Sequence, residues 1–271
     1  MILEGFNARL VLIDSAQAFH WVRVGDGYAA AVRGEEATLT PVDGGYRLSA
    51  TGEPYTGFWR EYFDLDRDYT KIAESCAAYP AAVEAMRLLP DMRVLNQPPW
   101  EALIAFILSA NNHVSRIRGL VLALCASYGD AVGDGGLHGF PSPTALAVRS
   151  EGELRALGAG YRAPYLLAAA RAVTEGFPLD SLRSLPYGEA KAALMTLRGV
   201  GPKVADCVLL FGCRHARAFP VDVWIERFMR DRFGLEGVRA RELPEIAYRM
   251  FGDSAGIVQQ SLFHCARLGL T

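Results

Sequence analysis

Two helical patterns joined by a very short glycine turn constrain the fold of this chain more than any other feature. The first pattern covers residues 188–197 and the second covers residues 202–211, so the connection is only Arg198-Gly199-Val200-Gly201. Glycine tolerates the backbone angles of such a tight turn. Pro202 stands at the first position of the second helix, where its missing N–H group costs nothing. The segment therefore predicts two adjacent helices that meet at a hairpin.

Lys203 lies just inside the second helix, away from the apolar stripe of Val204, Cys207, Val208 and Phe211. The backbone N–H groups of the turn before it can bind an anion such as phosphate. A protonated lysine is a poor nucleophile, but burial and the positive end of a helix both favour the neutral amine. The alternative is a plain helix connection with Lys203 in solvent.

Asp222 follows Lys203 by nineteen residues and directly precedes a helical pattern over residues 223–233. This position predicts that Asp222 caps the helix, which alone would explain an aspartate there. A carboxylate held by backbone N–H groups stays ionised and can stabilise a developing positive charge. Together the two residues suggest a phosphate grip beside an amine and a carboxylate.

The chain changes its pattern near residue 64. From Arg9 to about Phe63, short strand-like stretches alternate with turn residues, which predicts an antiparallel meander. After Asp64 the spacing of apolar residues is helical. We therefore predict an α+β fold, with a β-rich domain and its connecting helices over residues 1–95 and a helical domain over residues 96–271. The expected helices cover residues 98–112, 114–128, 150–157, 163–175, 188–197, 202–211, 223–233, 243–251 and 256–268, and residues 133–136 are expected to form a surface loop.

Composition indicates a folded protein with reduced thiols. A chain of 271 residues with 51% hydrophobic residues can build substantial cores. The five cysteines are odd in number and show no CxxC spacing, which argues against disulfides. The sequence contains neither a stretch of about 18 apolar residues nor a secretory signal at Met1-Ile2-Leu3-Glu4-Gly5, so we expect a cytoplasmic protein without a membrane partner. A net charge of −2 argues only weakly against nucleic acid, because bulk charge does not report a local positive field.

The run Gly-Val-Gly-x-Lys-Val-Ala-Asp-Cys at 199–207, followed by Pro-Val-Asp-Val at 220–223, resembles the helix-hairpin-helix DNA glycosylases. Among them it is most similar to the 8-oxoguanine DNA glycosylase/lyases. Further similar blocks follow in the expected order at residues 15–21, 109–112, 157–163 and 255–263, so the resemblance covers most of the chain. The cysteines that hold an iron–sulfur cluster in other branches are missing, since only Cys265 lies after Asp222.

The resemblance implies a monomeric, nucleoid-associated enzyme that extrudes 8-oxoguanine from double-stranded DNA into a pocket. Lys203 would attack the anomeric carbon of the sugar, Asp222 would stabilise the sugar cation, and the Schiff base would permit β-elimination. Phe263 and Cys207 would enclose the base, while Gln259 would pair with its Watson–Crick edge. The resemblance implies no required cofactor, although the hairpin could hold a monovalent cation against the DNA phosphate.

The resemblance also implies contacts with the strand that the base has left. Asn111 would fill the gap, Tyr161 would wedge into the stack, and Arg116 and Arg162 would read the opposite cytosine. Without the resemblance, Asn111 would be read as a helix end and the arginines as solvated surface. The pair Gln259 and Phe263 would be read as one buried helix face.

Two residues depart from the family pattern among the expected contacts. Gly199, Gly201 and Trp224 are expected beside the phosphates, but the family usually has a histidine at the position of Trp224, whose indole N–H carries no charge. Ala16 stands where a glycine usually offers its carbonyl to the N–H that distinguishes oxidised guanine. An alanine can offer the same carbonyl at negative φ, whereas a need for positive φ would put discrimination in doubt.

Two other interpretations stay open at this point. A monofunctional glycosylase for another damaged purine would use Asp222 without a nucleophilic lysine. A non-catalytic helix-hairpin-helix module that only holds DNA would need neither Lys203 nor Asp222.

Overall fold

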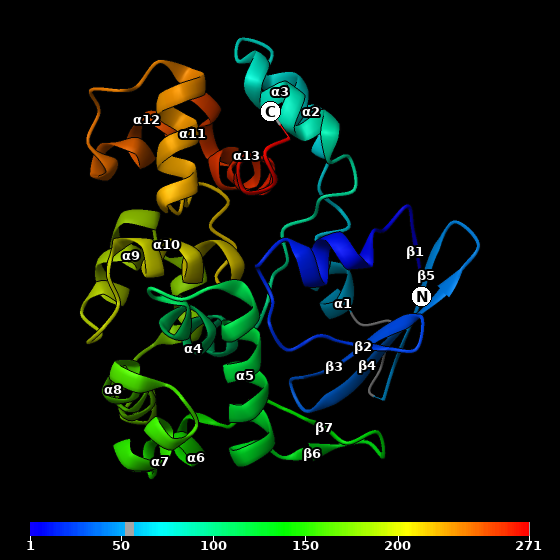
Figure 1. Ribbon diagram of the computed structural model, residues 1–271, viewed down its shortest axis with the longest axis vertical. Coiled ribbons are helices and arrows are strands. Elements are labelled where there is room, and N and C mark those ends of the chain that lie inside the picture. Colours follow the sequence, from blue (N-terminus) through cyan, green and yellow to red (C-terminus); the bar gives the residue numbers. More distant parts are fainter. Residues whose placement is uncertain (52–56, 271) are drawn as a thin grey trace.

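The computed structural model of the protein describes residues 1–51 and 57–270. A five-stranded antiparallel sheet lies beside a larger body of helices, which confirms the predicted α+β class (Figure 1). The strands are β1 (Ile2–Glu4), β2 (Val22–Val24), β3 (Gly27–Val32), β4 (Glu35–Val42), β5 (Gly45–Ala50), β6 (Ala131–Val132) and β7 (Leu137–His138). The α-helices are α1 (Gly57–Tyr62), α2 (Tyr69–Ser75), α3 (Pro80–Leu88), α4 (Pro99–Ser109), α5 (Val114–Tyr128), α6 (Pro143–Ala147), α7 (Glu151–Ala156), α8 (Ala163–Thr174), α9 (Tyr187–Met195), α10 (Pro202–Phe211), α11 (Val223–Phe233), α12 (Leu243–Phe251) and α13 (Ala255–Leu268). Short helical turns are η1 (Arg9–Asp14), η2 (Gly160–Arg162), η3 (Leu179–Ser184), η4 (Ala240–Glu242) and η5 (Gly252–Ser254).

The sheet has the order β1-β5-β4-β3-β2, so the N-terminal strand returns to pair with the end of the meander. Strand β1 was not predicted, and two segments inside the predicted meander are helical instead: residues 57–62 form α1 and residues 9–14 form the helical turn η1. The side chain of Asn7 accepts a hydrogen bond from the Leu10 amide at 3.0 Å and thereby caps that turn. This local cap outweighs the β-like composition of the segment that follows.

The two parts of the molecule have separate hydrophobic cores. Behind the sheet, Trp21, Trp59, Tyr62 and Phe63 are fully buried, and the Trp21 indole donates to the Tyr62 hydroxyl at 2.9 Å. In the helical part, α4 is buried along its whole length and packs against α5, α8 and α10. Helix α4 therefore forms a rigid support beside the hairpin.

The predicted hairpin joins α9 to α10. Gly199 has a φ of +89°, and a Cβ atom there would lie 2.3 Å from the Tyr165 ring, so the turn requires glycine at this position. Asp206 on α10 is buried and accepts hydrogen bonds from Tyr187 and Lys191 of α9, each at 2.7 Å. These bonds tie the two helices of the hairpin together.

Most predicted helices agree closely with the structure, and α5, α10, α11 and α12 have the predicted bounds. The predicted loop at residues 133–136 is the turn between β6 and β7. That small hairpin and the short helix α6 were not expected.

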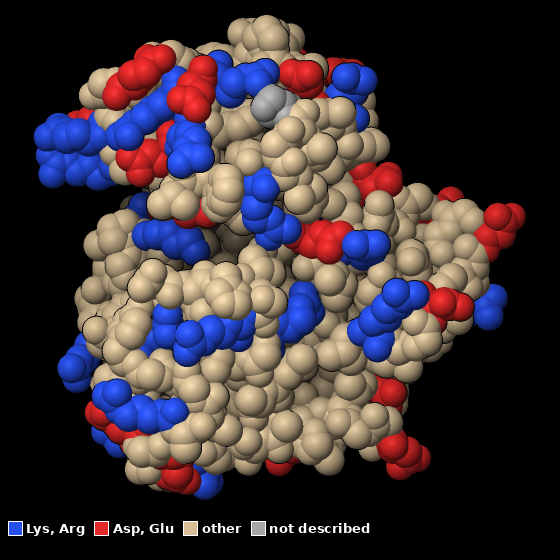
Figure 2. Space-filling view, in the orientation of Figure 1, with Lys and Arg blue, Asp and Glu red and all other residues tan. Residues whose placement is uncertain are grey.

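A hollow opens on the face shown in Figure 2, between the part that carries α11 and α12 and the part that carries α4 and α5. Lys and Arg side chains border this hollow on several sides, whereas most Asp and Glu side chains lie farther away. The local surface at the hollow is therefore more basic than the net charge of −2 indicates.

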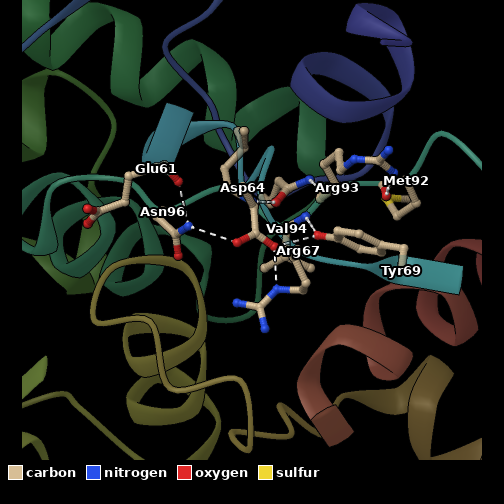
Figure 3. Close-up of polar contacts among 10 residues, drawn as sticks. Glu61, Asp64, Arg67, Tyr69, Met92, Arg93, Val94 and Asn96 are labelled. Atoms are coloured by element: carbon tan, nitrogen blue, oxygen red, sulfur yellow. Dashed lines mark hydrogen bonds and ion pairs between the residues drawn. The ribbon is translucent and has the colours of Figure 1, made fainter. Parts of the chain in front are cut away.

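A buried carboxylate joins the sheet domain to the segment that leads into α4 (Figure 3). Asp64, with a φ of +51°, accepts from Tyr69 at 2.8 Å, from the Arg67 guanidinium, and from Asn96 at 3.4 Å. The Tyr69 hydroxyl in turn accepts from the Val94 amide at 2.8 Å. Residues 94–96 are thereby held against the end of the sheet domain, which fixes the start of α4.

Candidate active site

A pocket of about 310 Å³ lies where α4, α10 and α13 meet the turn after η1. This volume is at the lower end of the range for small-molecule pockets, which is about 300–1,000 Å³. Seven of the predicted site residues line it: Ala16, Lys203, Cys207, Asp222, Trp224, Gln259 and Phe263. The other six, Asn111, Arg116, Tyr161, Arg162, Gly199 and Gly201, lie outside its lining.

Lys203 is partly buried in the first turn of α10, and its amine reaches the wall formed by α4. The Nζ atom lies 3.5 Å from the Ser109 hydroxyl oxygen and 5.6 Å from the centre of the Phe106 ring. The Ser109 hydroxyl donates its own proton to the Phe106 carbonyl at 2.7 Å, so its oxygen is free to accept from the amine. The amine therefore has one weak polar partner and an apolar neighbour.

Asp222 caps α11 as the sequence predicts. One carboxylate oxygen accepts from the amides of Trp224 at 3.0 Å and Ile225 at 2.9 Å. These bonds hold the carboxylate at the positive end of the helix. The arrangement supplies a fixed negative charge in the same pocket as the Lys203 amine.

Cys207 and Phe263 line the pocket from α10 and α13. Burial raises the pKa of Cys207 to about 11, although the nearby Lys203 charge acts in the opposite direction. The side chain is therefore a neutral thiol near pH 7 and serves as a packing surface. Phe263 is partly exposed and offers a ring on which a planar base can stack.

In the side-chain amide of Gln259, the nitrogen has a hydrogen-bond partner within the described chain and the oxygen has none. Its Nε2 atom donates to the Pro220 carbonyl at 3.0 Å. Its Oε1 atom is buried and has no hydrogen-bond partner within the described part of the chain. A buried acceptor of this kind suits a ligand that brings N–H donors, such as the Watson–Crick edge of a guanine.

Ala16 has a φ of +58°, in the left-handed region that favours glycine. Ala16 therefore does not have the negative φ at which an alanine would be free of strain. The backbone follows a path suited to glycine, and the alanine bears the resulting strain. The position still lines the pocket wall.

The segment after α4 gathers three of the expected DNA contacts. Asn111 is exposed with a φ of +48°, a conformation that asparagine tolerates better than most residues. Tyr161 is 47% exposed, and its hydroxyl donates to the Ala110 carbonyl at 3.1 Å. Arg116 is exposed on α5, with one guanidinium nitrogen 3.5 Å from the Gly158 carbonyl.

The structure places Arg162 differently from the expectation that it reads the opposite cytosine. Its side chain is buried, and its guanidinium donates to the Ala110 carbonyl at 2.8 Å and to the Asn111 carbonyl at 2.9 Å. Its Nε atom and one terminal nitrogen are therefore committed to backbone carbonyls. In this conformation Arg162 holds the Asn111 turn in place.

The remaining expected phosphate contacts are the hairpin glycines, outside the pocket lining, and Trp224, within it. Gly201 directly precedes α10, and the amides at the start of a helix are suited to bind an anion. Trp224 is 37% exposed, and the Arg227 guanidinium lies 5.9 Å from the centre of its ring. The charge that Trp224 lacks is therefore present one helical turn later.

Five polar residues of the pocket were not among the predicted site residues: Ser109, Asn112, His113, Gln260 and Arg267. Ser109 could have been suspected because it opens the Ser-Ala-Asn-Asn block at residues 109–112. No local signal marked Gln260 or Arg267, since their partners lie at the opposite end of the chain.

Across residues 1–51 and 57–270, no helix is both long and apolar enough to cross a membrane. In the same part of the chain, no group of three His, Cys, Asp or Glu side chains is arranged to hold a metal ion.

Two family models together match most of the chain. Residues 3–103 match the model of the 8-oxoguanine DNA glycosylase N-terminal domain, and residues 104–250 match that of the HhH-GPD superfamily of base excision DNA repair proteins. The chain is 35% identical over 231 residues to a probable N-glycosylase/DNA lyase of Methanothermobacter thermautotrophicus, covering 77% of this chain and 72% of that protein. It is 36% identical to the N-glycosylase/DNA lyase of Saccharomyces cerevisiae, covering 63% of this chain and about half (49%) of the yeast protein.

A solved structure is similar over almost the whole chain. It is the Clostridium acetobutylicum 8-oxoguanine glycosylase/lyase in complex with double-stranded DNA that contains cytosine opposite 8-oxoguanine. The TM-score is 0.90 at 28% identity, with 99% of this chain and 94% of that chain covered.

Proposed function

The chain belongs to the HhH-GPD superfamily of base excision DNA repair proteins and carries the N-terminal domain of 8-oxoguanine DNA glycosylases, and from this premise we propose that it excises 8-oxoguanine from duplex DNA and then cleaves the strand. One observation carries this proposal. Lys203 and Asp222, which come from different helices, line one pocket together with Phe263. A nucleophile, a fixed anion and an aromatic surface are the groups that such a reaction needs.

In the proposed reaction, the flipped base stacks on Phe263 and packs against Cys207. Its N–H groups donate to the buried Oε1 atom of Gln259, an acceptor that has no donor within the described chain. The base is thereby held by shape and by its Watson–Crick edge. Because the partners are fixed by packing, recognition requires little rearrangement of the pocket.

The Lys203 amine forms a bond to the anomeric carbon while the glycosidic bond breaks, and the electron pair leaves with the base. The Asp222 carboxylate stabilises the positive charge that develops on the sugar. Ring opening then gives a Schiff base with Lys203. Loss of a C2′ proton and departure of the 3′ phosphate cleave the strand on the 3′ side of the lesion.

The proposed chemistry requires no cofactor, because the Schiff base with Lys203 itself acts as the electron sink. The DNA is held around the pocket by Asn111, Arg116 and Tyr161, and by the turn at residues 199–201. These groups lie on the exposed surface beside the pocket or at the start of α10. Contacts with phosphate should therefore make binding dependent on salt.

Borohydride trapping tests this function. Incubated with duplex DNA containing 8-oxoguanine opposite cytosine, the wild type should become covalently attached, and Lys203→Gln should abolish the adduct. Lys71→Gln is the matched control, because Lys71 lies on α2 with its side chain 80% exposed. The control should give a normal adduct.

Each other outcome selects another interpretation. Excision by the wild type without any adduct would indicate a monofunctional glycosylase. Binding without excision would indicate a DNA-holding module. An adduct that persists in Lys203→Gln would show that another amine is the nucleophile.

A further inference from the structure

Side chains from distant parts of the chain occupy nearly all backbone carbonyls of the turn around Ala16. The donor and acceptor pairs are Arg118 with Leu12, Ile13 and Ala18, Arg267 with Asp14, Gln260 with Ser15, and Gln97 with Gln17. Within the described chain, no hydrogen bond reaches the carbonyl oxygen of Ala16. This oxygen is therefore the acceptor that the turn leaves free, and Ala16 is one of the residues that line the pocket.

Gln260 makes the bond that lies next to this free acceptor. Its Nε2 atom donates to the Ser15 carbonyl at 2.8 Å, across 245 positions of sequence. The side chain is only 2% exposed and lines the pocket. Because Gln260 follows Gln259 on α13, one helix positions both the amide that faces the base and the peptide unit that precedes Ala16.

The backbone at Ala16 needs such support. A left-handed conformation is unfavourable for alanine, and strained residues persist only where the surroundings hold them firmly. The Gln260 bond fixes the orientation of the peptide between Ser15 and Ala16. Without it, Ala16 could relax toward negative φ, and its carbonyl would turn.

The chemistry of the base explains why this orientation matters. Guanine presents a lone pair at N7, which is an acceptor. Oxidation at C8 converts that nitrogen into an N–H donor. A free carbonyl in the pocket attracts the donor and repels the lone pair, so it discriminates between the two bases.

We propose that Gln260 is a positioning residue that determines selectivity for oxidised guanine by holding the Ser15–Ala16 peptide so that the Ala16 carbonyl can accept from the lesion. The inference deepens the proposed function and rests on it. Gln260 itself needs no contact with the base.

The test compares two reactions of the same protein. Gln260→Leu keeps the approximate size of the side chain but removes the donor. Single-turnover excision of 8-oxoguanine opposite cytosine should fall about ten- to a hundred-fold, because a contact made in the transition state is lost. Cleavage of DNA with a preformed abasic site should stay within about twofold, because that substrate carries no base to recognise.

Gln97→Leu is the matched control. It removes a similar buried bond of 2.7 Å from the same turn, to the Gln17 carbonyl. Gln17 stays anchored because its own side chain donates to the Arg93 carbonyl and accepts from the Leu95 amide. Both variants should lose thermal stability, but only Gln260→Leu should change the ratio of the two reactions.

A parallel loss of both reactions in Gln260→Leu, or unchanged excision, would overturn the inference while leaving the proposed function intact. If Gln260→Leu does not fold, Gln260→Asn replaces it, since the same amide on a shorter stem cannot reach Ser15. An inactive wild type would instead contradict the proposed function itself.

Discussion

The two ends of the pocket are held by bonds of very different range along the sequence. At the end that carries Asp222, the carboxylate bonds to amides only two and three residues away. At the end that carries Ala16, the turn is held from α13 by Gln260 and Arg267, across 245 and 253 positions. The first arrangement forms wherever its helix forms, whereas the second exists only when the whole chain is folded.

This difference separates chemistry from recognition. The cap of α11 provides a fixed charge without help from the N-terminal domain. The Ala16 turn belongs to the N-terminal part of the chain and is held beside the reactive groups by side chains of the helical part, among them Gln260 and Arg267 of α13. Damage to the interface between the two parts should therefore impair the choice of base before it impairs the reaction at the sugar.

The largest effect should come from Asp222→Asn, which removes the negative charge at the end of the pocket that is held by local bonds. Asparagine caps a helix about as well as aspartate, so the stability should change by less than about 0.5 kcal/mol. Excision should nevertheless fall by about 10²- to 10³-fold, because the charge that stabilises the sugar cation is lost. Single-turnover kinetics and thermal unfolding measure the two quantities.

Asp222→Ala is the companion variant. It removes both the charge and the cap, and it should cost about 1 kcal/mol of stability in addition. Turnover in Asp222→Asn equal to that of the wild type would contradict the role of the charge.

A second prediction concerns the buried pair behind the Ala16 turn. Glu101 on α4 and His20 have their nearest atoms 3.8 Å apart, and neither of these atoms has a hydrogen-bond partner in the described part of the molecule. Burial raises the pKa of Glu101 to about 8 and lowers the pKa of His20 to about 3. Both groups are therefore neutral near pH 7 in the folded protein.

The pKa of Glu101 is higher in the folded than in the unfolded chain. The contribution of Glu101 to the free energy of unfolding is therefore complete below about pH 4.5 and is lost as the pH rises toward 8. Between pH 5 and 8 the free energy of unfolding of the wild type should fall by roughly 3 kcal/mol because Glu101 ionises in the unfolded chain. Glu101→Gln has no carboxyl group at this position, so its free energy of unfolding should not show this decrease. His20 affects both proteins equally. Denaturant unfolding at several pH values measures the difference, and parallel curves for the two proteins would refute it.

The smallest expected effect is that of Ala16→Gly, which tests backbone strain in the turn that is held by long-range bonds. Glycine relieves the strain of the positive φ but gains freedom in the unfolded chain, so the net gain should be about 0.5 kcal/mol. Thermal unfolding measures it. A loss of stability would show that the turn does not strain the alanine.

The helices and the catalytic pair could be predicted because their signals are local. Pro202 begins α10, Asp222 caps α11, and the intervening apolar spacing marks the buried faces. The turn η1 was missed because its cap, Asn7, stands outside the segment that looked like a strand. Arg162 was expected to read the opposite cytosine, and its burial was not predicted because a sequence does not show that the Ala110 and Asn111 carbonyls need a donor.

The local sequence was sufficient to predict the hairpin, the position of Lys203 in the first turn of α10 and the capping role of Asp222. These features depend on residues within a few positions of a helix end. Three features of the pocket could be seen only in the folded structure. They are the positive φ of Ala16, the Gln259 oxygen that has no partner within the described chain, and the hydrogen bond from Gln260 to the Ser15 carbonyl. The physical reason is that a buried polar atom must find its partner in space, and in this fold the partner of Ser15 stands on the last helix.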